Sequence, residues 1–315
     1  MLAARVRSGL EETFHEGAVA ISKPGGSVVA FSGDIDRPFF LRSSAKPFQA
    51  FVSQSSGAEW QPVELAMASA SHRGFPVHFA LVESMLAKVG LGESHLQCPF
   101  AWPLGEEARY QVIVQGEPRK RRIWSDCSGK HAGFLRACVG SGWPVEGYLQ
   151  PDHPLQKRII EFVSEIGDYP AEPVGVDGCG APVMRTTVRA MSLMFARLVT
   201  DPRLAEVFSV MHKYPALVAA NGEVDASIAT ALNAAAKGGA LGCTGISLAS
   251  GTGIAVKSWD GLHEAAGVGA VAALEAMDLL PAAASHYLEP IGKPVAFGGG
   301  ESVGHMESRL ELTFS

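Results

Sequence analysis

The chain has 315 residues, of which 47% are hydrophobic and 18% charged, a composition typical of globular enzymes and far from that of disordered proteins. The formal net charge of −6 argues against a nucleic-acid partner. No apolar run reaches the length of a membrane span, and the first residues lack the apolar core of a signal peptide. The five cysteines are widely spaced, which favours reduced thiols, so we expect a cytoplasmic protein.

Short strand-like segments alternate with longer helical ones in the first part of the chain. Residues 17–31 predict two strands joined by a Lys-Pro-Gly-Gly turn. Apolar spacing predicts a helix over 76–92, and residues 110–115 read as a strand. The one basic run, 118–124, is better explained as a solvated loop than as a nucleic-acid patch.

The same alternation continues to the end of the chain. A strand followed by a tight turn is expected from residue 253 onward. Helical spacing recurs in four segments: 152–167, 181–199, 225–236 and 263–280. We therefore predict an α/β or α+β fold in one domain spanning residues 1–315, and leave open whether it divides into two closely packed lobes.

A serine and a lysine stand three residues apart in the segment LRSSAKPFQA. The hydroxyl of Ser43 would need a base within hydrogen-bond reach to attack a carbonyl group, and Lys46 could be that base only in its neutral form. Residues three apart share a helix face. Pro47 is tolerated in a first helical turn, so the pattern predicts that a helix begins here. Serine–x–x–lysine occurs often by chance, and alone it is a weak signal.

Other polar residues stand at the ends of predicted elements. Ser71 and His72 precede the helix predicted from residue 76, where a serine either caps the helix or helps to bind an anion. Lys237 follows the helix predicted over 225–236, a position where lysines commonly face the helix dipole. No glycine-rich stretch completes a phosphate or dinucleotide motif, so no organic cofactor is expected.

Two cysteines about 50 residues apart suggest a metal site or a packed core. Cys127 stands in SDCSGKHAGF, close to Lys130 and His131, and Cys179 lies in a glycine-flanked turn. Two thiolates could bind one zinc ion. Neither cysteine belongs to a C-x-x-C or C-x-x-H motif, and buried cysteines behave equally well as small apolar residues. The spacing leaves both interpretations open.

Taken together, six segments resemble the asparaginase II family, also called class 3 or Rhizobium etli-type asparaginases. They occur in order over roughly 300 residues, far more than any single motif covers. The segments are DIDRPFFLRSSAKPFQA, ASASHRGFPVHF, CSGKHAGFL, GWPVEGYLQPDHPLQ, GVDGCGAPV and SGTGIAVKSWDG. The resemblance implies a serine β-lactamase/glutaminase-like fold, in which helices flank an antiparallel sheet.

The resemblance also implies the chemistry. The enzyme would hydrolyse L-asparagine to L-aspartate and ammonia through an acyl-enzyme, as a homodimer in the cytoplasm with a small-molecule amide as its partner. Ser43 would be the nucleophile with Lys46 as its base, and Ser71 with Lys237 would pass a proton to the leaving ammonia. The implied site residues are catalytic Ser43, Lys46, Ser71 and Lys237, zinc-binding Cys127, Lys130 and Cys179, and, as candidates for substrate contact, Arg42, His72 and His131.

The sequence departs from the family pattern at several positions. Arg73 stands where the family usually has serine, Phe75 where it has glutamate, and Asp126 where asparagine is common. The family also usually has an acidic residue near Leu241. Two lost carboxylates and one added cation could change how the substrate's ammonium group is recognised. Two alternatives therefore stay open: a serine–lysine hydrolase of another amide, and a zinc-stabilised amino-acid-binding protein with weak or no catalysis.

Overall fold

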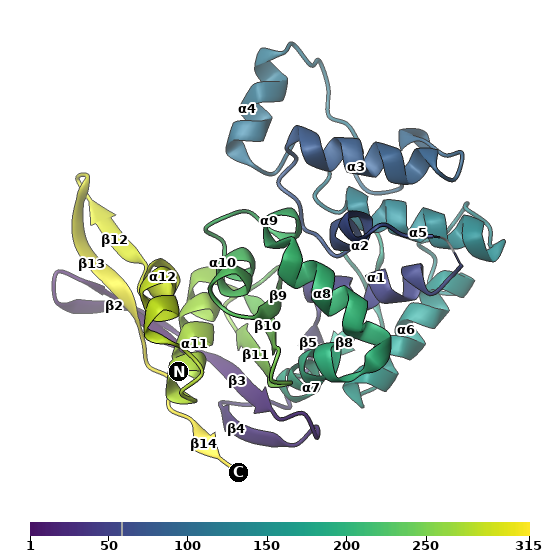
Figure 1. The fold of residues 1–315 in the computed structure, drawn as a ribbon. Coiled ribbons are helices and arrows are strands. Elements are labelled where there is room, and N and C mark those ends of the chain that lie inside the picture. Colours follow the sequence, from purple (N-terminus) through teal and green to yellow (C-terminus); the bar gives the residue numbers. More distant parts are fainter. Residues whose placement is uncertain (58) are drawn as a thin grey trace.

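The computed structural model describes residues 1–57 and 59–315. A six-stranded antiparallel sheet lies at its centre (Figure 1). Consecutive neighbours in the sheet pair antiparallel throughout. The order across the sheet is β14 (Thr313–Phe314), β4 (Val28–Ser32), β3 (Gly17–Ser22), β11 (Gly253–Ser258), β10 (Cys243–Leu248) and β9 (Ala234–Gly239).

Both faces of this sheet are covered, because side chains alternate along each strand. In β3, Ala18 and Ala20 join one buried cluster, whereas Val19 and Ile21 join another. Helix α7 (Val188–Thr200) covers the first face and α11 (His263–Ala276) covers the second. Every residue of β3 is consequently buried. Burial on both faces explains why the sequence of β3 is a nearly continuous apolar run and not an alternating one.

Helix α7 lies very close to the sheet. A Cβ atom added to Gly245 would lie 2.1 Å from the Phe195 ring, and one added to Gly253 would lie 2.1 Å from the Ser192 carbonyl oxygen. Both glycines are therefore required by the close approach of the helix and not by turn geometry.

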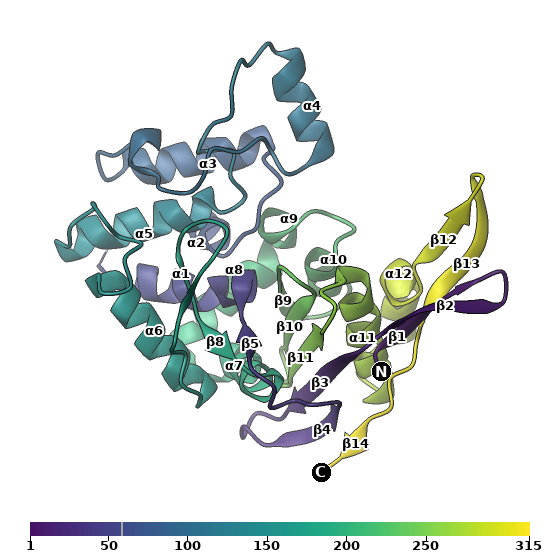
Figure 2. The same ribbon diagram turned by 180° about the vertical axis from the view of Figure 1, so that it is seen from behind.

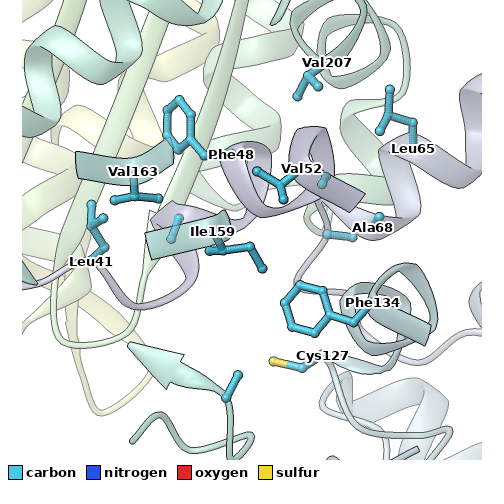
Figure 3. Close-up of a cluster of buried hydrophobic side chains, with 14 of the residues drawn as sticks. Leu41, Phe48, Val52, Leu65, Ala68, Cys127, Phe134, Ile159, Val163 and Val207 are labelled. Atoms are coloured by element: carbon cyan, nitrogen blue, oxygen red, sulfur yellow. The ribbon is translucent and has the colours of Figure 1, made fainter. Parts of the chain in front are cut away.

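A lobe of helices adjoins the sheet beside β9 (Figure 1). Its centre is α1 (Lys46–Gln54), whose Phe48 and Val52 share a buried cluster with Phe134 and Ile159 (Figure 3). The short helix η1 (Arg42–Ala45) leads into α1. The other elements are α2 (Pro62–Ala68), α3 (Pro76–Ala87), η2 (Glu93–His95), α4 (Glu106–Val114), α5 (Ser128–Ser141), α6 (Pro154–Gly167), η3 (Pro202–Leu204), α8 (Ala205–Lys213) and α9 (Pro215–Val218).

A second, four-stranded sheet projects on the side away from the helical lobe, as both views show (Figures 1 and 2). Its order is β12 (Val295–Gly298), β13 (Glu301–Ser308), β1 (Ala3–Arg7) and β2 (Leu10–His15). Helices α10 (Val224–Ala231) and α12 (Ala282–Gly292) pack beside α11 and β9. Two short pairs complete the fold: β5 (Phe39–Phe40) with β8 (Arg185–Thr186), and β6 (Gly175–Val176) with β7 (Pro182–Val183).

The predicted fold class, an antiparallel sheet flanked by helices, is confirmed. The hairpin within 17–31 and the helices at 76 and 152 are present, with ends at Ala87 and Gly167. None of the helices in the described residues is both long and apolar enough to cross a membrane. The single-domain assignment stays a prediction. Within the described residues the apolar core forms two large clusters, one centred on the helical lobe and one between the sheet and α11.

Three element predictions were wrong. Residues 110–114 belong to helix α4, whose buried Ala108 and Val112 have helical spacing. Residues 181–187 form short strands, and α7 begins only at Val188. The alanine-rich segment 225–236 predicted one helix, but α10 ends at Ala231 and β9 starts at Ala234. Alanine favours helix on its own, and pairing with β10 overrides that preference here.

Candidate active site

A cavity of about 570 Å³ opens where the helical lobe meets β9, α10, α11 and α12. Of the predicted catalytic residues, Ser43, Ser71 and Lys237 line it. They come from η1, from the segment after α2, and from β9. Residues almost 200 positions apart in the sequence are thus brought to one solvent-accessible space.

Ser43 is held by an unusual backbone conformation directly before it. Arg42 has a φ of 53°, in the left-handed region that non-glycine residues rarely occupy. The guanidinium of Arg42 forms an ion pair with Asp177, at 2.8 Å between Nε and Oδ1. Arg42, the residue before Ser43, is thereby attached to the turn that carries Cys179.

Lys46 is fully buried at the start of α1 and reaches the cavity through Ser71. Its Nζ donates hydrogen bonds to the Ser71 hydroxyl at 2.9 Å and to the Ala70 carbonyl oxygen at 2.7 Å. A carboxylate oxygen of Asp126 lies 4.0 Å away. Within the described residues, no hydrogen bond joins Lys46 to Ser43. The lysine therefore contacts the second serine of the site directly.

Lys237 lies on strand β9 and not at a helix end as predicted. Its Nζ donates to the Asp225 carboxylate at 2.7 Å and to the Gly238 carbonyl oxygen at 3.0 Å. Burial opposes ionisation of Asp225, but the charge of Lys237 and the hydrogen bond from it outweigh burial, and the pKa of Asp225 is lowered. The two side chains form a buried ion pair at the cavity wall.

A second ion pair links Arg73 to Glu223, and both residues line the cavity. Carboxylates are therefore present despite the departures from the family pattern: Asp126, Glu223, Asp225 and Glu264 all contribute to the lining. Leu241, in contrast, is 58% exposed. Of the four departures named above, Arg73 and Asp126 line the cavity, and Arg73 is the one that adds a cation there.

The predicted substrate-contact residues Arg42, His72 and His131 lie outside the set of described residues that line the cavity. His72 is buried, and its Nε2 lies 2.8 Å from the Ser128 hydroxyl. Burial and the nearby charges of His78 and Lys46 lower the pKa of His72 well below its ordinary value. Nδ1 of His131 hydrogen-bonds the Tyr148 hydroxyl at 2.8 Å. In this structure these side chains support the walls of the site.

The predicted zinc-binding residues lie together behind the cavity. Lys130 Nζ is 3.1 Å from Cys179 Sγ, and Cys127 and Cys179 are both buried and unbridged. A hydrogen bond from Cys127 lowers the pKa of the Cys179 thiol, and Lys130 lowers it further despite burial. Cys127 precedes α5 and follows Asp126, which lines the cavity. Cys127 is thus adjacent in sequence to a residue that lines the cavity.

The donor set fits zinc only if the lysine takes part. No three His, Cys, Asp or Glu side chains in the described residues could hold a metal ion together. The thiolates of Cys127 and Cys179 are ligands that zinc accepts, and Lys130 would join them only as a neutral amine. Binding of the metal would have to enforce that form because, despite burial, the two cysteines raise the pKa of Lys130. Nε2 of the buried His131 makes no hydrogen bond of normal geometry with any described residue, which leaves a polar atom unsatisfied beside Cys179.

Sequence reasoning missed several lining residues: Glu223, Asp225, Thr244 and His263. Asp225 was recognisable as the start of a helical segment. Its pairing with Lys237 was hidden because the segment between them was predicted to be one continuous helix. Thr244 stands opposite Gly238 in the β9–β10 pairing, which only the strand register reveals.

Two serines, with a lysine next to one of them and an ion-paired lysine in the same cavity, are the groups that nucleophilic cleavage of an amide requires. The family model described as L-asparaginase II matches residues 3–308, so the chain belongs to the L-asparaginase II family and is an amidohydrolase that acts on a small-molecule amide. No curated protein matches the chain.

Solved structures show a more distant likeness. The crystal structure of Mglu in its native form has 16% identity and a TM-score of 0.46, covering 87% of this chain and 67% of that one. The glutamate form of Mglu has 17% identity and a TM-score of 0.48, covering 87% and 64%. A Bacillus glutaminase has 11% identity and a TM-score of 0.35, covering 84% and 91%. Likenesses of this size carry no argument about activity, and this chain spans about two thirds of the length of Mglu.

Proposed function

We propose that this amidohydrolase is a class 3, Rhizobium etli-type asparaginase that hydrolyses L-asparagine to L-aspartate and ammonia. One observation carries the proposal. Ser43 and Ser71 line the same cavity, and the buried amine of Lys46 contacts the hydroxyl of Ser71 at 2.9 Å. A serine nucleophile needs a base and a path for its proton, and this arrangement supports both.

In the first step, Oγ of Ser43 forms a bond to the side-chain amide carbon. The proton of Ser43 passes to Lys46, and the Lys46–Ser71 hydrogen bond supports a path through Ser71. The C–N bond then breaks as the departing nitrogen takes up a proton, which releases ammonia and leaves a β-aspartyl ester on Ser43. Water hydrolyses the ester, with the same groups moving the proton back.

Lys237 has a different environment from Lys46 and, in this proposal, a different part. Its ion pair with Asp225 supports a positively charged group at the cavity wall, suited to stabilising negative charge on the substrate. Backbone N–H groups near Ser43 would hold the oxyanion that forms when the hydroxyl adds to the carbonyl carbon. Arg73 would contact the substrate's α-carboxylate after exchanging Glu223 for it.

We further propose one zinc ion held by Cys127, Lys130 and Cys179. When bound, the ion would fix the loops that carry these residues. Asp177 links the Cys179 turn to Arg42 by an ion pair, and Asp126, whose carboxylate lies near Lys46, directly precedes Cys127. Fixing the two loops would therefore keep both Ser43 and this carboxylate in place. A homodimer in the cytoplasm without an organic cofactor completes the proposal.

The experiment is a substrate panel with a matched pair of variants. Ammonia release from L-asparagine, L-glutamine and related amides is measured for the native chain, Ser43→Ala and Ser44→Ala. Ser44 is adjacent but buried, and its hydroxyl donates to the Leu41 carbonyl oxygen. Ammonia from asparagine that disappears in Ser43→Ala and persists in Ser44→Ala supports the proposal. Equal rates in the native chain and Ser43→Ala would refute it.

A second candidate is a serine–lysine hydrolase of a different amide, and Arg73 favours it because this added cation lines the cavity. Its signature would be weak turnover of asparagine and strong turnover of another amide, again lost in Ser43→Ala. Binding of asparagine without turnover of any amide would instead indicate the third reading, an amino-acid-binding homologue.

A further inference from the structure

The cavity is lined by polar residues, among them Glu223 and Glu264 at the starts of α10 and α11, and by apolar ones. Near Ser43, Ser71 and Lys237 it is polar, as described above. Its other lining residues include a group of small and apolar ones supplied by α10, α11 and α12 and the segment that follows: Val224, Gly267, Pro290, Ile291 and Pro294. We call this group the apolar wall. Asparagine has a single side-chain methylene group, so it has almost nothing to bury against such a surface.

Gly267 lies between two other residues of the apolar wall, Val224 and Ile291. A Cβ atom added there would lie 3.0 Å from Cγ2 of Val224 and 3.1 Å from Cγ2 of Ile291. The ends of these two side chains therefore converge on the glycine, and any larger residue at this position would push them into the cavity. The φ of Gly267 requires no glycine, so packing and the shape of the cavity explain its presence.

The apolar wall is continuous with the catalytic groups. Val224 directly precedes Asp225, whose carboxylate pairs with Lys237 at 2.7 Å. Val224, Asp225 and Lys237 all line the same cavity. The volume of about 570 Å³ lies within the roughly 300–1,000 Å³ range of cavities that bury ligands of drug size, which exceeds what a free amino acid fills.

The geometry points to a substrate class: amides that carry an apolar substituent, which lies against Val224, Gly267 and Ile291 while the amide carbon faces Ser43. This inference rests on the proposed function, because it names the substrate of the same site. The substituent could be attached to the amide nitrogen or to the α-amino group. Both share the same chemistry at the wall, and the substrates below distinguish them.

The test compares L-asparagine with two substituted amides. N4-butyl-L-asparagine would yield L-aspartate and butylamine, and Nα-butanoyl-L-asparagine would yield Nα-butanoyl-L-aspartate and ammonia. An apolar pocket discriminates by at least about tenfold, so kcat/KM for one substituted amide should exceed that for asparagine by about that factor. Whichever substrate gains shows where the substituent is attached.

Three variants locate the effect. Gly267→Val fills the space beside the apolar wall, and Ile291→Ser makes part of the wall polar. Each should lower the ratio of kcat/KM for the preferred substituted amide to kcat/KM for asparagine at least about fivefold. Ala272 lies on the same helix but lines a different cavity, so Ala272→Val should leave the ratio unchanged. The inference is overturned if asparagine is turned over as fast as both substituted amides, or if neither wall variant changes the ratio.

A binding measurement separates this inference from the proposed function. Calorimetric titration of the Ser43→Ala protein needs no turnover. If the native chain hydrolyses none of the three amides, the proposed function fails, yet tighter binding of a substituted amide that is lost in Gly267→Val would still support the wall. Equal binding of all three amides to the Ser43→Ala protein overturns the inference, whatever the native chain hydrolyses.

Discussion

The amine of Lys46 donates a hydrogen bond to the hydroxyl of Ser71, 25 residues away, at 2.9 Å. The serine three residues before the lysine, which suggested the pair from sequence, makes no such bond within the described residues. Ser71 is therefore hydrogen-bonded to Lys46 in the absence of substrate. A change at Ser71 consequently tests the proposed proton path more directly than a change at Ser43.

Replacement of Ser71 by alanine should lower kcat by about 10²–10⁴-fold, the range associated with removing a group that transfers a proton. Steady-state ammonia release measures the effect. Ser69→Ala is the matched control, because the Ser69 hydroxyl is buried and donates to the Leu65 carbonyl oxygen. A rate for Ser71→Ala within threefold of the native rate would remove Ser71 from the proton path.

Replacement of Asp225 by asparagine should lower kcat/KM by about 100-fold while the protein stays folded. The substitution keeps the size of the side chain but removes the negative charge that lies 2.7 Å from Lys237, so the lysine loses its ionic partner in a buried site. Kinetics and a thermal melt are measured together. Asp36→Asn breaks an exposed ion pair with Arg189 and serves as the control; if both variants behave alike, the pairing of Asp225 has no catalytic consequence.

The zinc proposal predicts a metal content that depends on specific cysteines. The native chain, purified without chelator, should carry about one zinc per chain, and Cys127→Ser and Cys179→Ser should each carry far less because a hydroxyl is a poorer zinc ligand than a thiolate. Elemental analysis gives the stoichiometry. Cys138, also buried and free, supplies the control Cys138→Ser, which should retain zinc. Chelation should lower the melting temperature of the native chain and not that of Cys179→Ser.

A buried ion pair in the helical lobe predicts a pH-dependent stability. Glu64 and Arg136 are 2% exposed and 2.8 Å apart, and removing one partner of such a pair costs about 3–5 kcal/mol, so Glu64→Gln should lower the free energy of unfolding at pH 7 by this amount. Burial opposes ionisation, but hydrogen bonds from the Gln61 backbone, Lys88 and Arg136 lower the pKa of Glu64 below its ordinary value of 4.5.

Because the folded-state pKa of Glu64 is lowered, the stabilisation is present above pH 4.5 and is lost as the pH falls through the folded-state value. Urea unfolding at several pH values should therefore give curves for the native chain and Glu64→Gln that are separated by a constant amount at neutral pH and converge below pH 4.5. A separation that is the same at pH 3 and pH 7 would show that the carboxylate charge does not stabilise the fold.

Local patterns predicted the hairpin and the main helices, because each depends on a few neighbouring positions, whereas the resemblance to a family indicated Ser43, Ser71 and Lys237. The Asp225–Lys237 pair was beyond their reach. Asp225 and Lys237 are 12 positions apart in the sequence, so a continuous helix would separate them by about 18 Å. The helix ends at Ala231 only because the next residues pair with β10, a contact that no local signal records. Similarly, the apolar run near Val112 resembles a strand, but it has no strand partner and packs as a helix.

The central pairing of β3 with β11 joins two stretches separated by the whole helical lobe. On the ribosome, β11 emerges more than 200 residues after β3, a delay of roughly 10–50 seconds at ordinary rates of synthesis. The β3–β4 hairpin and the helices that follow it can form in the meantime, while the other edge of β3 still lacks its partner β11. Lys237 and the lining residues of α11 and α12 are also synthesised after the helical lobe, so the two serines emerge long before the other side of the cavity exists.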